Sequence, residues 1–250
     1  MRTNLAIRRL ETEAEFREAL DVEKRVWGFA DVELVPWRLM VVATESGGLV
    51  AGAFDGDTMI GFSLAFGGIH PDGTSYWHSH MTGVLASHQN RGVGKRLKLH
   101  QRKQAIERGI DLIAWTFDPL EIRNAYFNVV RLGVQVERFL PNLYGLTSSP
   151  LQGSLPTDRL VAEWYVNSSR VAAALAGKKN DDRDKQVDAT IEVPAEIERL
   201  RHSDIEAARS IQTRVREEFQ QSFAAGLVVV GYRVTGDGGA FELGRSSEAV

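Results

Sequence analysis

The stretch VLASHQNRGVGKRL, residues 84–97, constrains the fold more than any other part of the chain. It passes from an apolar run through a short loop and two glycines into a basic helical pattern. Glycine loses much backbone entropy on folding, so a pair directly before a helix needs a physical reason. A strand, a Gly-x-Gly loop and a helix N-terminus together present free N–H groups at the positive end of a helix dipole. This arrangement predicts an anion site, and phosphate is its usual occupant.

The glycine spacing separates this stretch from two common phosphate motifs. No Gly-Lys-Ser/Thr follows Gly92 and Gly94, so the stretch is not a Walker loop. The third glycine of a dinucleotide fingerprint is also missing. A plain turn remains the alternative interpretation of the pair.

The rest of the chain shows strand and helix patterns in an order typical of a mixed α/β sheet with helices on its faces. Strands are expected at 5–10, 47–54, 58–69, 75–86, 111–119, 135–145 and 159–167. Helices are expected from a Thr12–Glu15 capping box toward Trp27, at 93–108 and at 121–133, with a loop or broken helix at 28–40.

A change in composition divides the chain near residue 180. Residues 1–176 are predicted to form the main domain, and the polar, charged run at 177–190 is interpreted as a linker. In the extension, 191–250, a capping box at Ser203 and Glu206 should open an amphipathic helix, followed by a hairpin at 227–243. An extension this small needs a partner surface. It should dock on the main domain or on a partner subunit, and the second option would make a homodimer.

Composition narrows the function classes. The chain has 250 residues, no cysteine, 43% apolar residues and a net charge of −3. It therefore has no disulfide or thiolate site and no general attraction to nucleic acid or anionic membranes. The early charges exclude a signal-peptide core, and no apolar run approaches the roughly 20 residues that span a bilayer. These features predict a soluble cytoplasmic protein.

The motif Gln89-Asn90-Arg91-Gly92-Val93-Gly94 resembles the Gln/Arg-x-x-Gly-x-Gly/Ala signature of the GCN5-related N-acetyltransferase (GNAT) superfamily. The element order over residues 5–168 resembles that fold as well. The resemblance implies a mixed, mostly antiparallel central sheet flanked by helices, and acetyl-CoA as co-substrate. It also implies that loop amides from Gln89 through Lys95 hold the pyrophosphate. Val84, five residues before Gln89, would offer its backbone to the thioester and pantetheine.

Two histidines precede this motif. Because side chains alternate along a strand, Tyr76, His78, His80, Thr82 and Val84 are expected to share one face. The His-x-His spacing resembles the arylalkylamine branch of the superfamily, whose histidines line the amine site and relay its proton. His80 and His78 are therefore the candidate catalytic bases, since imidazole titrates near neutral pH. Packing without a role, or a shared metal, are the alternatives, and no carboxylate–histidine cluster completes a metal site.

The general acid is less clear from the sequence. The family often places a tyrosine four residues before the glycine that ends the fourth helix, and here that position is Val129. Tyr126 is the nearest substitute, and water is the other proton source. Asn128 is a candidate contact of the pantetheine arm, since asparagine in this helix often plays that role in relatives.

The resemblance implies an N-acetyltransferase with a small amine acceptor and no metal. Trp27, Phe29 and Trp37 lie in the segment that covers the acceptor site in the family, although core packing explains them equally well. A non-catalytic acyl-CoA-binding module is the alternative function. Nucleic-acid binding is a third, because the helix at 93–108 is basic, but that face is expected to be solvated. The basic residues of this helix include Lys95, Arg96, Lys98, Arg102 and Lys103.

Overall fold

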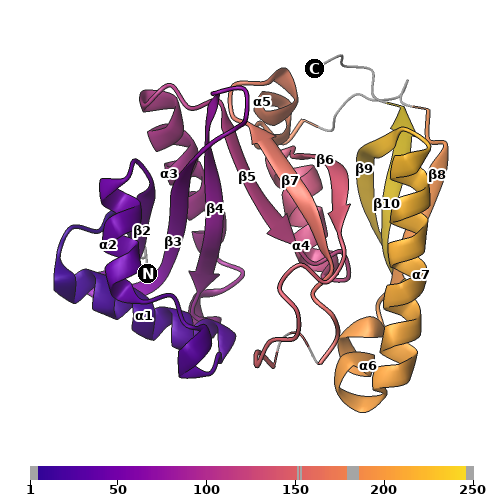
Figure 1. The fold of residues 1–250 in the computed structure, drawn as a ribbon, viewed down its shortest axis with the longest axis horizontal. Coiled ribbons are helices and arrows are strands. Elements are labelled where there is room, and N and C mark those ends of the chain that lie inside the picture. Colours follow the sequence, from indigo (N-terminus) through magenta and orange to yellow (C-terminus); the bar gives the residue numbers. More distant parts are fainter. Residues whose placement is uncertain (1–4, 151, 153, 179–185, 246–250) are drawn as a thin grey trace. The chain divides into compact units, whose positions relative to one another are not determined.

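The computed structural model describes residues 5–150, 152, 154–178 and 186–245 (Figure 1). The chain forms two compact units. Unit 1 comprises residues 1–115 with 148–151, and unit 2 comprises residues 116–147 with 152–250. The predicted domain boundaries stay a prediction, and residues 179–185 of the predicted linker lie outside the described residues.

Unit 1 is built on a mostly antiparallel sheet, as the sequence predicts. Strands β1 (Leu5–Arg9), β2 (Leu49–Asp55), β3 (Thr58–Ile69) and β4 (Ser75–Val84) pair antiparallel in this order, and β5 (Leu112–Phe117) pairs parallel with β4. The β2–β3 hairpin turns at Gly56, which has a φ of +61°. The predicted fold class is confirmed.

Helices cover both faces of this sheet. Helix α1 (Glu13–Trp27) begins at the predicted capping box: the Thr12 hydroxyl accepts from the Glu15 N–H, and the Glu15 carboxylate accepts from the Thr12 N–H. Helices α1 and α2 (Trp37–Glu45) bury Phe16, Met40 and their neighbours against one sheet face. Helix α3 (Val93–Glu107) packs Val93 and Leu97 on Ala53 and Ile60 of the other face.

The segment predicted as a loop or broken helix is more ordered than expected. It contains a short 3-10 turn at Asp31–Glu33 and then the full helix α2, which starts directly after Pro36. Proline suits the position before a helix because its fixed φ is compatible with the first turn. The sequence analysis did not predict the continuous helix Trp37–Glu45 that follows Pro36.

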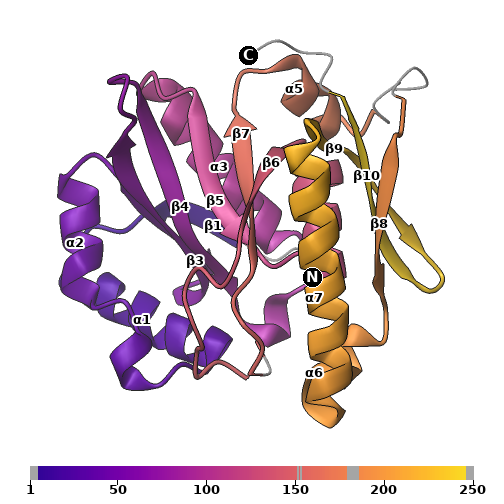
Figure 2. The same ribbon diagram turned by 45° about the vertical axis from the view of Figure 1, so that its right-hand side comes forward.

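Unit 2 has two pieces of sheet. Helix α4 (Ile122–Tyr126) continues as a π-helical turn (Phe127–Leu132), and β6 (Gln135–Leu140) pairs antiparallel with β7 (Arg159–Tyr165), before α5 (Ser169–Leu175). The remaining elements include a three-stranded sheet in the order β8-β10-β9. They are β8 (Ala189–Pro194), α6 (Ile197–Ser203), α7 (Ile205–Ala224), β9 (Leu227–Thr235) and β10 (Gly238–Arg245). Figure 2 shows α7 lying lengthwise beside this sheet, where the rings of Phe219 and Phe241 stand 5.0 Å apart.

Unit 2 corrects part of the sequence interpretation of the extension. Ser203 is not an N-cap: it ends α6, and its hydroxyl donates to the Arg199 carbonyl. Asp204 caps α7 instead, accepting from the Ala207 N–H at 3.1 Å. Strand β8 and helix α6 were not predicted, because both are short and their patterns are weak. Within the unit, the extension packs on β6, where the rings of Phe139 and Phe219 are 5.8 Å apart.

Candidate active site

The loop between β4 and α3 leaves a helix N-terminus without a side-chain cap. After a 3-10 turn at Ala86–His88, the chain passes through Asn90, with a φ of +59°, and reaches Gly92 at the N-cap of α3. Gly92 has a φ of +78°, which side chains disfavour and glycine accepts. Among the described residues, no side chain caps this helix end, so its first N–H groups point outward as hydrogen-bond donors.

The space beside the two glycines is empty of protein atoms. A Cβ added at Gly92 would meet nothing within 4 Å, and one at Gly94 would meet only the Val84 Cγ2 at 4.0 Å. Backbone conformation therefore explains Gly92, whereas Gly94 is helical and leaves open space. Free N–H donors, a positive helix end and this open space fit a diphosphate group. Glycine at position 92 therefore accommodates a positive φ, whereas glycine at position 94 keeps open the space beside the helix end.

The other loop residues differ in what they can offer a ligand. Gln89 donates from its Nε2 to the Val84 carbonyl at 3.0 Å, which ties the loop to the end of β4. Val93 is buried in the core, so only its backbone is available. Asn90 and Arg91 are exposed, and Lys95 is half-buried. The structure brings the predicted cofactor residues Val84 and Gln89 through Lys95 together around one helix end.

Strand β4 is paired with β5 over a short distance. Their parallel ladder consists of Trp77 with Ile113 and His78 with Ala114. Between Ser79 and Val84, the β5-facing backbone groups of β4 are not used by this ladder. Strand β4 therefore presents polar main-chain groups that a ligand could pair with. The Val84 carbonyl itself already accepts from the Gln89 amide, so the role predicted for the Val84 backbone stays a prediction.

A β-bulge overturns the predicted side-chain alternation of β4. In the β3–β4 ladder, Leu64 pairs with Met81 but Ala65 pairs with Ser79, so His80 is the extra residue. Residues opposite each other in a ladder share a face, and an extra residue shifts every later side chain to the other face. The prediction that His78, His80, Thr82 and Val84 share one face is therefore wrong.

The ladder and its packing assign the two faces. Ser79, Thr82 and Val84 face α3, because the Ser79 hydroxyl bonds to residues of that helix. His78 and Gly83 face α1, because Trp27 packs directly over Gly83. The His80 ring lies on the same side as His78, 5.8 Å from it and 5.6 Å from the Phe66 ring. The bulge thus keeps the two histidines together and removes them from the Val84 side chain.

Their surroundings hold both imidazoles in the neutral form at neutral pH. Burial lowers the pKa of His78, and the charge of Lys98 lowers it further. His80 is exposed at one edge, but partial burial between its neighbouring rings, and then the charge of His78, lowers its pKa. A neutral imidazole can accept a proton, so both candidates have the protonation state that a general base requires.

Lys98 is a site feature that sequence reasoning misjudged. It was expected on the solvated basic face of α3, yet it is only 5% exposed. Its Nζ donates to the Ser79 hydroxyl at 2.9 Å and lies 3.6 Å from the centre of the Trp115 ring. Burial lowers the pKa of Lys98 to about 7. Helical spacing was the available signal, because Gln101 and Ala105, three and seven residues after Lys98, lie on the same face of α3 and are buried.

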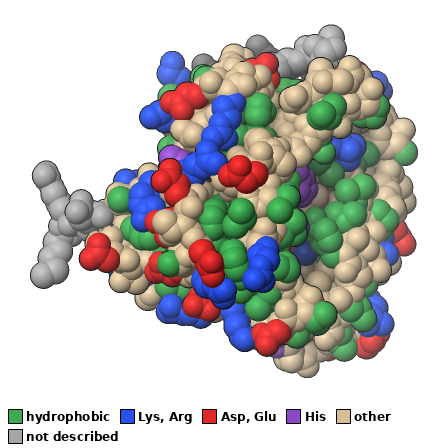
Figure 3. All heavy atoms as spheres, turned by 60° about the vertical axis from the view of Figure 1, so that its left-hand side comes forward, with side chains coloured by type: hydrophobic (Ala, Val, Ile, Leu, Met, Phe, Trp, Pro, Cys, Tyr) green, Lys and Arg blue, Asp and Glu red, His purple; other side chains and the backbone are tan. Residues whose placement is uncertain are grey.

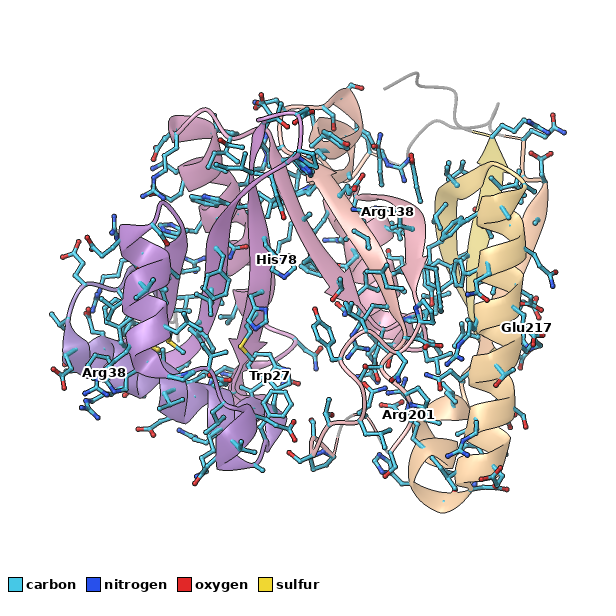
Figure 4. All side chains as sticks on the ribbon, in the orientation of Figure 1. Trp27, Arg38, His78, Arg138, Arg201 and Glu217 are labelled. Atoms are coloured by element: carbon cyan, nitrogen blue, oxygen red, sulfur yellow. The ribbon has the colours of Figure 1, made fainter. Side chains whose placement is uncertain are left out.

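The three predicted pocket aromatics separate into two groups. Trp27 stacks near Phe29 at 6.3 Å and meets Phe62 edge-on at 6.1 Å, on the sheet face of the histidines. Trp37 instead lies between Arg17 and Arg38, each 4.6 Å from its ring. Figure 4 shows Trp27 at the end of α1 and Arg38 at the outer side of the helices. Trp37 is nevertheless half-buried and packs against the core of unit 1. Trp27 packs over Gly83, on the sheet face of the histidines.

Tyr126 and Asn128 belong to unit 2. Tyr126 is half-buried at the end of α4, and Asn128 is buried in the π-helical turn, 3.4 Å from Asn124. Val129, at the position of the family tyrosine, is buried. The acid role of Tyr126 and the pantetheine contact of Asn128 stay predictions. Among the described residues, no group of three or more His, Asp or Glu side chains could hold a metal ion.

Comparison with known proteins decides the family. Residues 7–127 match the acetyltransferase (GNAT) family. Residues 7–127 therefore belong to the GNAT family. The resemblance inferred from the Gly92 motif is confirmed, and the motif lies within the matched residues. No curated protein matches the sequence.

Solved GNAT structures share the fold at low sequence identity. The ribosomal-protein-S18-alanine N-acetyltransferase from Escherichia coli is 15% identical, with a TM-score of 0.52 over 66% of this chain and 96% of that chain. The acetyltransferase yncA from Salmonella typhimurium, solved with acetyl-CoA, is 13% identical, with a TM-score of 0.52 over 66% and 95%. An aminoglycoside 6'-acetyltransferase type Ii is 18% identical, with a TM-score of 0.51 over 65% and 98%. No helix in the described part of the chain is long and apolar enough to cross a membrane.

Proposed function

We propose that this protein is an acyl-CoA-dependent N-acetyltransferase that moves an acetyl group from acetyl-CoA to the amine of a small acceptor. The observation that carries the proposal is the uncapped α3 N-terminus beside Gly92 and Gly94, within residues that match the GNAT family. The yncA structure contains acetyl-CoA, which supports this choice of donor.

Each part of the candidate site has a chemical task in such a transfer. The backbone N–H groups of Val93, Gly94 and Lys95 bind the diphosphate, and the Val84 end of β4 orients the arm that follows it. Acetyl-CoA, when bound, supplies an activated acyl thioester. His80 and His78 accept the proton that the acceptor amine must lose, because a lowered pKa favours the neutral form of both rings at neutral pH.

The acceptor side of the proposal rests on charge and aromatic packing. Trp27, stacked with Phe29, supplies an apolar wall on the sheet face of the histidines. On the face of the molecule that Figure 3 shows, acidic and basic side chains are interspersed with hydrophobic ones. Together with the net charge of −3, this mixture favours a small cytoplasmic acceptor over nucleic acid or a membrane. A homodimer stays a prediction.

A non-catalytic acyl-CoA-binding module is the second candidate, and it is favoured by Val129 at the position of the family tyrosine. The pair of neutral histidines favours catalysis, since a binding module has no need for a proton acceptor. Release of free thiol from acetyl-CoA in the presence of a panel of small amines separates the two. Binding without thiol release from any amine would support the module.

Donor binding at the loop is tested with a matched pair of glycine variants. Gly92→Asp places a carboxylate beside the expected phosphate, whereas Gly109→Asp changes a glycine of similar conformation at the other end of α3, with a φ of +68° and open space around it. Both should lose similar stability from backbone strain. Acetyl-CoA at about 100 times its Kd should stabilise the wild type and Gly109→Asp by roughly 2.7 kcal/mol. An equal thermal shift in Gly92→Asp would contradict the proposed donor site.

A further inference from the structure

Lys98 is a buried amine for which the described residues supply no carboxylate within ion-pair distance. Its polar contact is the Ser79 hydroxyl, and its remaining close neighbour is the face of Trp115. A buried ammonium without an opposite charge is expensive, so packing alone does not favour lysine here. A side chain of this kind next to a candidate active site calls for a functional explanation.

The contacts of Lys98 attach it to the middle of β4. Lys98 donates to the Ser79 hydroxyl at 2.9 Å, and Ser79 donates in turn to the Gln101 Oε1 at 2.9 Å. All three side chains are buried. Ser79 stands between His78 and His80 in the sequence, so this chain of hydrogen bonds fixes the amine behind the histidine pair. Strand β4 separates the amine on the α3 side from the imidazoles on the α1 side.

Among the described residues, Lys98 is the charged side chain from another element that acts on His78. Strand β3 presents Phe66 opposite His78, and β5 presents Ala114, neither of which titrates. On its own strand the neighbouring titratable ring is His80. From α3, the charge of Lys98 acts on His78. The burial of Lys98 and the closeness of Ser79 keep this influence from being screened by water.

We propose that Lys98 is a positioning residue of the candidate active site, whose amine, held by Ser79 behind β4, keeps a proton off His78. The proposal rests on the proposed acetyl transfer, in which His78 and His80 must be neutral to accept a proton. When the solution is acidic enough to protonate His78, Lys98 is itself charged and opposes the second charge. The site thus stays proton-accepting at a lower pH than the two histidines would without this lysine.

The test compares Lys98→Met with Lys103→Met. Methionine keeps the length of the side chain and removes the amine, and Lys103 is an exposed lysine of the same helix, paired with Glu107 at 3.7 Å. The imidazole signals of the six histidines are followed by NMR against pH in each folded variant. The His78 signal is assigned from its loss in His78→Gln. Turnover against pH is measured with any amine that the wild type accepts.

In Lys98→Met, the His78 titration should move to higher pH, and the His80 titration should move less, because its charged neighbour is His78 rather than Lys98. Lys103→Met should leave both unchanged. The acidic limb of the pH–rate profile should move to higher pH together with His78. An unchanged His78 titration in folded Lys98→Met overturns the proposal, and so does a shifted titration with an unmoved rate profile. The NMR titration needs no turnover, so failure to find an acceptor would count against the proposed function and not against this coupling.

Discussion

The burial of Lys98 makes a quantitative prediction about stability. Its amine is 5% exposed, and burial lowers its pKa from 10.5 to about 7. Because the folded-state pKa of this base is depressed, the unfolded chain binds more protons between pH 7 and 10.5. The free energy of unfolding should therefore rise with pH across that window. Below pH 7 both states carry the charge, and the full penalty of burying it applies.

The size of the effect follows from the same pKa values. At about 1.36 kcal/mol per pKa unit, the penalty below pH 7 is on the order of 5 kcal/mol. Between pH 6 and 9 it should fall by roughly 2.7 kcal/mol. Lys98→Met has no such titration but loses the hydrogen bond to Ser79. Its stability relative to wild type should therefore be greatest at pH 6 and decline by that amount toward pH 9.

Urea unfolding at pH 6, 7, 8 and 9 measures this difference for wild type and Lys98→Met. Lys103→Met is the control, and its difference from wild type should stay constant over this range, because Lys103 is exposed. Taking differences at each pH removes the titrations that all three proteins share. A difference between Lys98→Met and wild type that does not change with pH would refute the reasoning and show that the amine keeps an ordinary pKa.

Three further predictions concern other buried or catalytic groups. Glu23 is fully buried, accepts from the Val35 N–H at 2.9 Å and has its pKa raised by burial to about 7. Because the folded state holds this proton to a higher pH than the unfolded state does, the contribution of Glu23 to the free energy of unfolding should fall by about 2.5 kcal/mol between pH 5 and 8. Urea unfolding of Glu23→Gln should lack that fall. His80→Gln should lower turnover about 10- to 1000-fold while the acetyl-CoA thermal shift persists, and equal rates at every pH would reduce His80 to a packing residue. Arg201 donates to Asp118 at 2.7 Å and to Glu121 at 2.9 Å within unit 2. Arg201→Met should cost about 3 kcal/mol in urea unfolding, because it removes the nearer of the two guanidinium groups beside the buried Asp118 and leaves Arg159 at 3.9 Å. A loss below about 1 kcal/mol would contradict this. Figure 4 labels Arg201, which belongs to α6 of unit 2.

Local patterns were enough to predict the parts of the site that depend on the backbone. The Thr12–Glu15 capping box and the strand–loop–helix around Gly92 both follow from residues within a few positions of one another. A positive φ at Gly92 is a property that sequence displays directly, because glycine accepts it readily. The family match over residues 7–127 confirms the interpretation of that motif.

Tertiary packing decided where the side chains of the site point. The bulge at His80 depends on how β4 aligns with β3. Strict alternation therefore placed His78 on the same face as Thr82 and Val84, whereas the bulge puts it on the opposite face. Lys98 looked like one of several basic residues on a helix, and only the neighbouring Ser79 and Trp115 show that it is buried. Register and burial arise from contacts between residues far apart in the chain. The sequence of an element therefore sets most of its local backbone conformation. Its neighbours in the fold determine which of its side chains are buried and which are placed to take part in catalysis.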